Sequence, residues 1–401
     1  MQQFLQLGLI ELPWWGYVLV ALIMTHMTTI SVTIFLHRNQ SHHALKLHPI
    51  VSHYFRFWLW LTTGTVTKEW VAVHRKHHAK CETDEDPHSP QIHGINKVLF
   101  DGIKLYRIEA KNTATLVKYG HGTPDDWIER NLYSQHVDLG IGIMLAIDLF
   151  LFGPIGFLVW GIQMLWIPFF AAGVINGVGH YYGYRNFSPN NTSTNIMPWG
   201  IIMGGEELHN NHHAYVTSAK FSNKWWEFDI GWTYIRVLEM LGLAIVRKVT
   251  PKIHLNPAKT PCDEETLRAI ITHRYDVLSS FSKYLNQSTI TEIRKLRNRA
   301  IPGLQDVRAL EAVRHWLQRE VGQMTEKEQE ALDQALHSSN ILSTTYSMRQ
   351  DLAALWSSSA TSKEQLVKQL ENWCQRAEGS DISALQEFSR KLRCYKLAVG
   401  V

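Results

Sequence analysis

Cysteine is scarce in this chain, with four residues in 401. They stand at positions 81, 262, 374 and 394 and form no CxxC pair, which argues against a disulfide framework, a cysteine-rich zinc site and a thiolate-bound iron centre. The sequence also contains no HExxH zinc-protease motif, no glycine-rich dinucleotide motif and no CxxCH haem-attachment motif. Four free thiols fit the reducing cytoplasmic side of a membrane, and electrons for any redox reaction have to come from another protein.

Charge is scarce in the first part of the chain. Residues 1–249 contain 37 Lys, Arg, Asp and Glu residues, whereas the shorter segment 250–401 contains 39. The net charge of +4 is mild and gives no reason to expect nucleic acid as a partner. We therefore predict a membrane domain over residues 1–249 and a soluble helical extension over residues 250–401. Helices of the extension are expected at 263–285, 306–321 and 326–336, with breaks at Pro302–Gly303 and Gly379–Ser380.

Long uncharged runs predict an all-α, multi-pass membrane bundle. Residues 12–36 carry no Lys, Arg, Asp or Glu, and about 20 helical residues are enough to cross a hydrocarbon core. Arg38 and Lys46 follow this run, so the positive-inside tendency puts its end on the cytoplasmic side. The run is not typical of a signal peptide, because it has neither a basic leader nor a small-residue cleavage site.

Two further apolar segments complete the predicted bundle. Residues 57–66 are too few to span and predict an interfacial helix. Residues 139–178 are interrupted at Gly153–Pro154 and predict two crossings joined by a tight turn. The first of these crossings is expected to begin near Leu132, which would place Asp148 close to the turn on the far side of the membrane.

Histidine is concentrated in the membrane part, with 17 of 21 residues before position 250. Eight of these histidines form three clusters: His37 and His42; His74, His77 and His78; and His209, His212 and His213. Positions i, i+3 and i+4 share one face of a helix, so the second and third clusters should each present three imidazoles in one direction. The first pair is five residues apart and would diverge on a regular α-helix, so we expect it where a helix ends.

The predicted topology brings the three clusters to one side of the membrane. Only the short interfacial helix separates the first two clusters, and the double crossing at 139–178 separates the second from the third. Eight imidazoles are too many for one zinc and fit two metal ions that each keep an open position. Imidazole alone does not distinguish iron, copper, nickel and zinc. Oxidation of an unactivated C–H bond at a membrane requires a redox metal, which favours iron over zinc. Three unrelated solvated histidine patches are the alternative to a single metal site.

Several flanking motifs resemble one known family. Glu69-Trp70 precedes the second cluster, Asp86-Pro87-His88 follows it, and Gly205-Glu206-Glu207-Leu208 leads into the third. A further motif runs from Asn176 through His180 to Tyr184. With these residues, segment 12–245 resembles the membrane-bound fatty-acid desaturases, specifically the Δ9 acyl desaturases, and bacterial members carry a C-terminal extension of this kind.

The resemblance implies a di-iron centre. Its expected ligands are His37, His42, His74, His77, His78, His180, His209, His212 and His213, with Asn176 reaching the metal through water. His43 adjoins His42, so ligation by the neighbour stays open, although the spacing favours His42. The chain departs from the animal enzymes in two ways, because Glu207 replaces a usual glycine and an extra membrane helix before the first cluster is missing.

The expected reaction is formation of a cis double bond, at Δ9 by resemblance, in a saturated acyl chain carried on CoA or membrane lipid. It consumes O2 and two electrons from a ferredoxin-like, cytochrome b5-like or flavin reductase partner. The expected location is the bacterial inner membrane, with the active site on the cytoplasmic side. A histidine-box hydroxylase of lipids or alkanes is the alternative enzyme, and a non-catalytic membrane metal carrier is the alternative of another class.

Other side chains are candidates for supporting roles at the site. For each of them, a purely structural role is the alternative. Five acids stand near the ligands and are candidates to hold a second imidazole nitrogen: Glu69, Glu82, Asp84, Asp86 and Glu206. Three tryptophans are candidates to line an acyl tunnel: Trp58, Trp60 and Trp70. Five basic residues are candidates to meet a phosphate head group: Arg38, Lys68, Arg75, Lys76 and Arg185.

Overall fold

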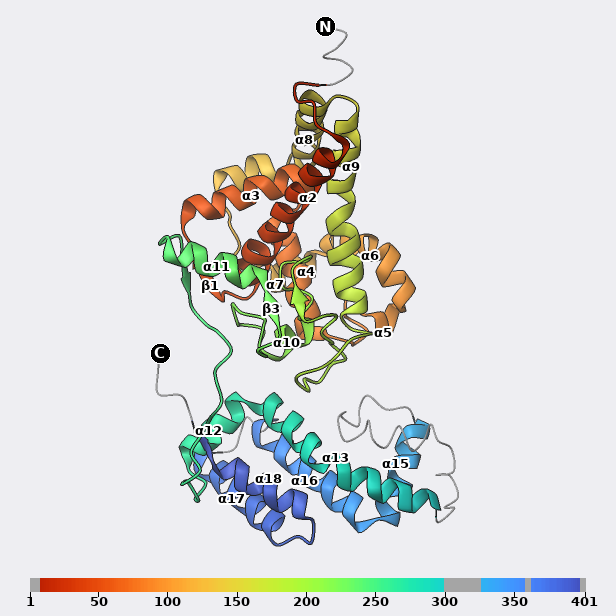
Figure 1. Cartoon of the computed structure of the whole chain (residues 1–401), viewed down its shortest axis with the longest axis vertical. Helices are drawn as coiled ribbons and strands as arrows, with labels where there is room; N and C mark the ends of the chain where they lie inside the picture. The colour runs from red at the N-terminus through yellow and green to blue at the C-terminus, as the bar shows by residue number, and fades with distance from the viewer. Residues whose placement is uncertain (1–7, 299–325, 358–361, 397–401) are drawn as a thin grey trace. The chain divides into compact units, whose positions relative to one another are not determined.

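The computed structural model describes residues 8–298, 326–357 and 362–396. The chain divides into two compact units, one of residues 1–185 with 191–250 and the other of residues 186–190 with 251–401 (Figure 1). Both units are helical, and the strands among the described residues form only three two-stranded ladders. The predicted all-α class is therefore confirmed at the level of secondary structure.

The first unit holds thirteen described helical segments. They are α2 (Trp14–Ser31), the π-helix η1 (Val32–Ser41), α3 (Pro49–Thr63), α4 (Thr67–Lys80), α5 (Pro90–His93), α6 (Ile95–Ala110), α7 (Thr113–Tyr119), the π-helix η2 (Glu129–Tyr133), α8 (Val137–Phe152), α9 (Ile155–Ile167), the π-helix η3 (Pro168–Val178), α10 (His209–Ala214) and α11 (Ile230–Met240). Strand β1 (Leu45–Leu47) pairs antiparallel with β4 (Ala244–Val246), and β2 (Trp199–Gly200) pairs parallel with β3 (Phe228–Asp229).

Two continuous helices are long and apolar enough to cross a membrane, Trp14–Ser41 and Ile155–Val178. Helix α8 is shorter, at 16 residues, and packs beside α9. Helices α2, α8 and α9 run together toward one end of the unit, away from the short helix α10 (Figure 1). The predicted turn at Gly153–Pro154 separates α8 from α9, as expected. Helix α8 begins at Val137 rather than near Leu132, because a separate π-helix occupies residues 129–133.

Asp148 lies four residues before the end of α8, close to the turn as predicted. Its side chain is buried, and the amide of Gln163 on α9 donates to its carboxylate over 2.8 Å. The pair explains a charged residue type inside an apolar helix without a catalytic role, since buried polar groups need a hydrogen-bond partner.

A close backbone contact joins α6 to η3. A Cβ atom on Gly102 would lie 2.4 Å from the carbonyl oxygen of Ala172, and a Cβ on Gly173 would lie 2.4 Å from that of Leu99. Both distances are shorter than carbon and oxygen tolerate, so only glycine permits this crossing. The contact fixes the end of η3, which carries Asn176 and is followed by His180.

The second unit is a helical bundle with its own core. Its described helices are α12 (Glu264–Thr272), α13 (Arg274–Asn298), α15 (Glu326–Ser338), α16 (Asn340–Ser357), α17 (Lys363–Glu378) and α18 (Ser383–Arg393), and β5 (His254–Leu255) pairs antiparallel with β6 (Tyr395–Lys396). The core includes Phe281, Leu370, Trp373 and Phe388. The indole of Trp373 donates to the carbonyl of Met348 over 2.7 Å, which links α17 to α16.

The predicted helices of the extension are partly correct. The helix expected at 263–285 breaks at His273, because its two halves pack on different partners, α12 on α17 and α13 on α16 and α18. Helix α15 covers the segment 326–336, and the predicted break at Gly379–Ser380 separates α17 from α18. The helix expected at 306–321 and the break at Pro302–Gly303 lie outside the described residues.

Oxidation provides a test of this packing, because the Sγ atoms of Cys262 and Cys374 lie 3.7 Å apart across 112 residues of sequence. We expect hydrogen peroxide to join them: the two thiols lose two protons and two electrons, and the peroxide is reduced to two waters. Peptide mapping under non-reducing conditions should find the linked pair in wild type and in Cys394→Ser, but not in Cys262→Ser. Absence of a 262–374 link in wild type would contradict the contact between α17 and the segment before α12.

Candidate metal centre

Three helical segments present the predicted histidine clusters. Helix α4 carries His74, His77 and His78, and the six-residue helix α10 carries the third cluster, each at the i, i+3, i+4 spacing. The first cluster lies where a helix ends, as predicted, but this end of the helix is a π-helix. His37 lies inside the π-helix η1, and the backbone N–H of His42 donates to the carbonyl of His37 over 3.2 Å, an i to i+5 bond. A π-helical turn puts residues five apart on nearly the same face, so the two imidazoles converge.

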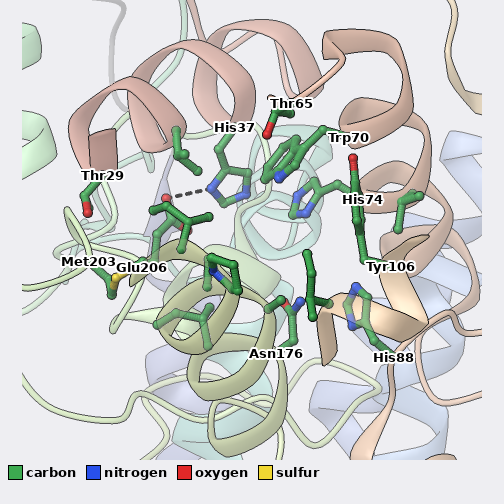
Figure 2. Close-up of a pocket in the computed structure, with 18 of the residues that line it drawn as sticks. Thr29, His37, Thr65, Trp70, His74, His88, Tyr106, Asn176, Met203 and Glu206 are labelled. Carbon is green, nitrogen blue, oxygen red and sulfur yellow. Dashed lines mark hydrogen bonds and ion pairs between the residues drawn. The ribbon is translucent and has the colours of Figure 1, made fainter. Parts of the chain in front are cut away.

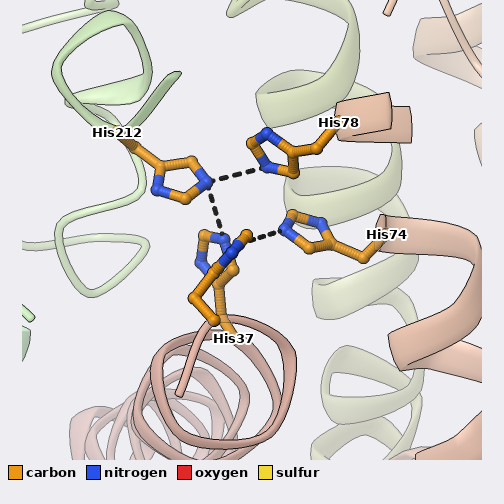
Figure 3. A group of neighbouring side chains, drawn as sticks. His37, His74, His78 and His212 are labelled. Atoms are coloured by element: carbon orange, nitrogen blue, oxygen red, sulfur yellow. Dashed lines mark hydrogen bonds between the residues drawn. The ribbon is translucent and has the colours of Figure 1, made fainter. Parts of the chain in front are cut away.

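The nine predicted imidazoles form two adjacent groups. The first imidazole group consists of His37, His42, His74, His78 and His212. The second imidazole group consists of His77, His180, His209 and His213. Figure 3 shows part of the first group, with rings from three separate segments turned toward one another. His43 is exposed, takes a hydrogen bond from Arg75 and lies outside both groups.

The Nε2 atoms within each group are closely spaced. In the first group the Nε2 atoms of His37 and His212 are 3.0 Å apart, and those of His42 and His74 are 2.9 Å apart. In the second group the Nε2 atom of His180 lies 3.0 Å from that of His209. Two imidazoles bound at right angles to one metal, with bonds of about 2.1 Å, have nitrogens about 3.0 Å apart. The donor atoms therefore fit two metal ions, one in each group.

Most of these imidazoles are held in the neutral form that metal binding requires. Burial, reinforced by neighbouring Arg75 and His43, lowers the pKa of His42 to about 3. Burial and the neighbouring imidazoles lower the pKa of His209 and His213 well below the usual histidine range. A buried charged imidazole would lack solvation and would repel its neighbours, so the fold selects the metal-binding form.

The outer nitrogens of four imidazoles have hydrogen-bond partners. The Nδ1 atom of His37 lies 2.7 Å from Glu206, and that of His77 lies 3.0 Å from Asp86. The Nδ1 atom of His180 lies 3.4 Å from Glu82, and that of His213 lies 3.2 Å from the Asn191 amide. The three carboxylates can each accept an Nδ1–H, which fixes the ring and directs its Nε2 atom to the metal. The Asn191 amide nitrogen donates instead, so this contact fixes only the ring orientation of His213.

Three of the five predicted acidic partners thus reach ligand imidazoles. Asp84 is exposed, and among the described residues no hydrogen bond joins Glu69 to an imidazole of either group. Burial favours a raised pKa at Asp86, but the charge and hydrogen bond of His77 outweigh it and hold the pKa of this carboxyl below its usual range. Burial raises the pKa of Glu206 to about 8, and its Oε1 atom lies 2.7 Å from Nδ1 of His37.

An apolar pocket opens onto both imidazole groups (Figure 2). It encloses about 870 Å³ of empty space, a figure that includes the open solvent at its mouth. Its polar lining includes His37 and His74 from the first group, His209 from the second, Asn176 and His88. The sequence analysis used His88 only as part of a motif, whereas its ring lies 4.4 Å from that of His77 and its buried Nδ1 has no partner among the described residues.

One of the three candidate tryptophans lines the pocket. Trp70 forms part of its wall and stacks on His74, with ring centroids 4.9 Å apart. Trp58 instead donates to the hydroxyl of Thr28, and the buried Trp60 donates to the carbonyl of His136. Trp58 and Trp60 therefore have the structural role of packing residues.

The structure corrects the proposed head-group role of Arg38. Its guanidinium is fully buried, forms a bidentate ion pair with Asp229 over 2.9 and 3.1 Å, and lies 3.8 Å above the ring of Phe221. Arg75 is used inside the fold as well, donating to backbone carbonyls that include those of Ser41 and Tyr119. Arg38 is a structural cation, since burial leaves it no access to a ligand, and Arg75 is held by its backbone partners.

Two further residues named in the sequence analysis have structural partners. Lys76 pairs with Glu109 over 2.9 Å, which makes it a third basic residue bound within the fold. Glu207, where animal relatives usually have glycine, is buried and accepts the backbone N–H groups of Met203 and Gly205. The glutamate at position 207, in place of glycine, therefore stabilises the turn before α10. Asn191 and Asp229 were not predicted, because an isolated Asn or Asp carries no spacing signal.

Comparison with known proteins places this site in context. The family model described as fatty acid desaturase matches residues 12–236. The Delta-9 acyl-lipid desaturase 1 of Arabidopsis thaliana is 31% identical over 235 residues, which cover 57% of this chain and 74% of the relative. The Acyl-CoA C20 Delta5-desaturase of Anemone leveillei is 34% identical over 250 residues, covering 60% and 75%. The sn-1 stearoyl-lipid 9-desaturase of Synechocystis sp. is 32% identical over 227 residues, covering 56% and 69%.

The extension has a similarity of its own. A family model described as transposase matches residues 268–399. The described part of this segment is helical apart from β6. Within the described residues, every cluster of three or more potential metal-ligating side chains lies in the first unit.

The lowered pKa values predict how the metal-free protein responds to acid. The pKa of His42, His74, His78, His180, His209, His212 and His213 is lower in the fold than in an unfolded chain. Below about pH 6.5 the unfolded chain binds more protons, so stability should be present above that pH and fall as the pH drops. The pKa of Glu206 is raised in the fold, so this single carboxyl has the opposite effect and favours the folded state as the pH drops.

Thermal unfolding of chelator-stripped protein between pH 8 and pH 5 measures this effect. We expect the Tm to decline below about pH 6.5, and a His254→Gln variant, altered at an exposed imidazole in the second unit, should follow the wild-type profile. A Tm that stays level or rises toward pH 5 would contradict burial of neutral imidazoles.

The Arg38–Asp229 pair predicts a large loss of stability on removal of one partner. Asp229→Ala should cost about 3–5 kcal/mol, because it leaves a buried guanidinium unpaired, and Asp229 also caps α11 at the N–H of Trp232. Asp125→Ala removes a carboxylate from an exposed pair with Arg130 and should cost about 0–1 kcal/mol. Denaturant unfolding in detergent compares the two variants, and equal losses would show that the buried pair is not a structural support.

Proposed function

The chain belongs to the fatty acid desaturase family, and we propose that it forms a cis Δ9 double bond in a saturated acyl chain carried on CoA or membrane lipid. The family's enzymes are oxygen-dependent oxidoreductases, and this chain is an acyl desaturase. The observation that carries the finer proposal is the apolar pocket that opens onto both imidazole groups. A saturated acyl chain offers no polar handle, so only such a pocket can hold it beside an oxidising centre.

We propose that the two imidazole groups each hold one iron ion. The ligands are the nine histidines of the two groups, with Asn176 reaching the second iron through water from the pocket wall. The neutral Nε2 donors and their spacing near 3 Å fit this assignment. When bound, the two irons supply the two-electron chemistry with O2 that removes two hydrogens from adjacent carbons.

The protein side chains contribute binding and orientation. The pocket wall, with Val32, Val73 and Ile175, excludes water and receives the methylene chain. Trp70 covers the outer face of His74, which keeps that ring in place beside the substrate. Glu206 and Asp86 hold His37 and His77 through their Nδ1 atoms, so the Nε2 atoms face the reaction site.

The proposed membrane arrangement has three crossings: α2 with η1, α8, and α9 with η3. Phe150 on α8 and Leu158 and Leu165 on α9 are 55%, 64% and 69% exposed. Hydrocarbon is a favourable solvent for such a surface, whereas water is not. We place the histidine groups on the cytoplasmic side of a bacterial inner membrane. We also propose that residues 1–249 and 250–401 are two domains, with the extension soluble.

The acyl carrier is CoA or a membrane lipid, since the relatives include both acyl-lipid and acyl-CoA desaturases. The electron donor is an external ferredoxin-like, cytochrome b5-like or flavin reductase protein, because the sequence contains no haem-attachment or thiolate motif. A hydroxylase would share the metal centre, and the product distinguishes the two reactions.

Expression in a bacterial host that cannot make unsaturated fatty acids tests the function. Wild type should restore growth and give monounsaturated chains whose double-bond position mass spectrometry reports. His77→Ala removes a proposed ligand and should abolish the product, whereas His43→Gln should keep it, because His43 lies outside both imidazole groups. Hydroxylated chains without a double bond, or full activity of His77→Ala, would refute the proposal.

A further inference from the structure

Glu82 follows helix α4 directly and has an unusual backbone. It is one of two non-glycine residues with positive φ among the described residues, at +61°. A left-handed conformation is strained for an ordinary side chain, and it persists only when the surrounding contacts require it. Its backbone N–H donates to the Asp86 carboxylate over 2.7 Å. The same carboxylate holds His77, so the strained turn and a proposed iron ligand share one anchor.

One oxygen of the Glu82 side chain makes three contacts. Its Oε1 atom accepts the backbone N–H of Thr192 over 2.6 Å, accepts the Thr192 hydroxyl, and lies 3.4 Å from Nδ1 of His180. The carboxylate is 9% exposed. Three donors directed at one buried oxygen fix its position, so this carboxylate is an anchor and not a solvated acid.

The residues around Glu82 also hold the backbone of His180. The Gln91 amide donates to the His180 carbonyl over 3.0 Å, and the Thr192 hydroxyl lies 2.8 Å from the same oxygen. Next to Thr192, Asn191 contacts Nδ1 of His213. His180 lies beyond the end of η3, in a turn that has no regular hydrogen-bond ladder of its own. Its ring orientation therefore depends on these loop contacts.

We propose that Glu82 is a positioning residue that directs Nε2 of His180 into the second imidazole group. An Nδ1–H donated to the carboxylate leaves the Nε2 lone pair free for the metal. The Nδ1 atom of His209, in contrast, is buried without a partner among the described residues, so an acidic partner is not a general feature of this group. The inference rests on the proposed two-iron function and deepens it.

Iron uptake tests the role without relying on activity. The full-length protein and its variants are stripped with chelator, reloaded with ferrous iron without oxygen, and assayed for iron per chain and for affinity by chelator competition. Glu82→Ala should retain one iron at wild-type affinity and bind the second 10- to 100-fold more weakly, the range typical of lost outer partners. Glu85→Ala is the matched control, because Glu85 belongs to the same loop and its side chain is 61% exposed.

Two further variants separate positioning from stability. Glu82→Gly accepts the positive φ without strain, so it should be at least as stable as Glu82→Ala when metal-free and yet bind the second iron as weakly. Glu82→Gln keeps an oxygen at the position of Oε1, through which all three contacts run, and should restore most of the affinity.

The outcomes are distinct. Two irons bound at wild-type affinity by both Glu82→Ala and Glu82→Gly would overturn this inference alone. A wild-type chain that takes up no iron would overturn both this inference and the two-iron function.

Discussion

The structure depends on the burial of nine imidazoles. Their ring nitrogens face one another, and the distance between them is about that between two ligand atoms on one metal. Most of these rings are buried, and the charged form of one would be repelled by its charged neighbours. The fold therefore favours neutral rings, and their inward lone pairs fit metal ions. The segments that carry these rings, from η1 to α10, are fixed by this requirement more than by their own helical preferences.

Two π-helices, η1 and η3, help to bring the imidazoles together. An α-helix would direct His37 and His42 to different faces, whereas the i to i+5 bond of η1 brings them together. The π-helix η3 ends where Asn176 and His180 are needed, and the close glycine contact with α6 holds it there. A π-helix has poorer hydrogen-bond geometry than an α-helix, so its presence at both places reflects the geometry of the site.

The sequence predicted those parts of the site that follow from spacing. The i, i+3, i+4 pattern identified the clusters at 74–78 and 209–213, and uncharged length identified the helices that end near them. It could not predict that the first cluster converges through a π-helix, because helix type here is set by tertiary contacts. Arg38 is a second example of a residue whose role depends on tertiary contacts. A basic residue after an apolar run resembles an interfacial charge, and only the fold reveals Asp229, 191 positions away, as its partner.

The outer contacts explain how a site assembled from both helices and loops can be rigid. The first imidazole group draws its rings from η1, α4 and α10 and from the residue that ends η1, and it has one acidic partner, Glu206. The second group includes His180 from a turn, and the contacts to Asp86, Glu82 and Asn191 all belong to this group. Loops position side chains less firmly than helices do, so additional hydrogen bonds are needed where the helical support ends. The unequal distribution of outer partners is thus a consequence of backbone structure, and it makes the loop after α4 part of the metal centre.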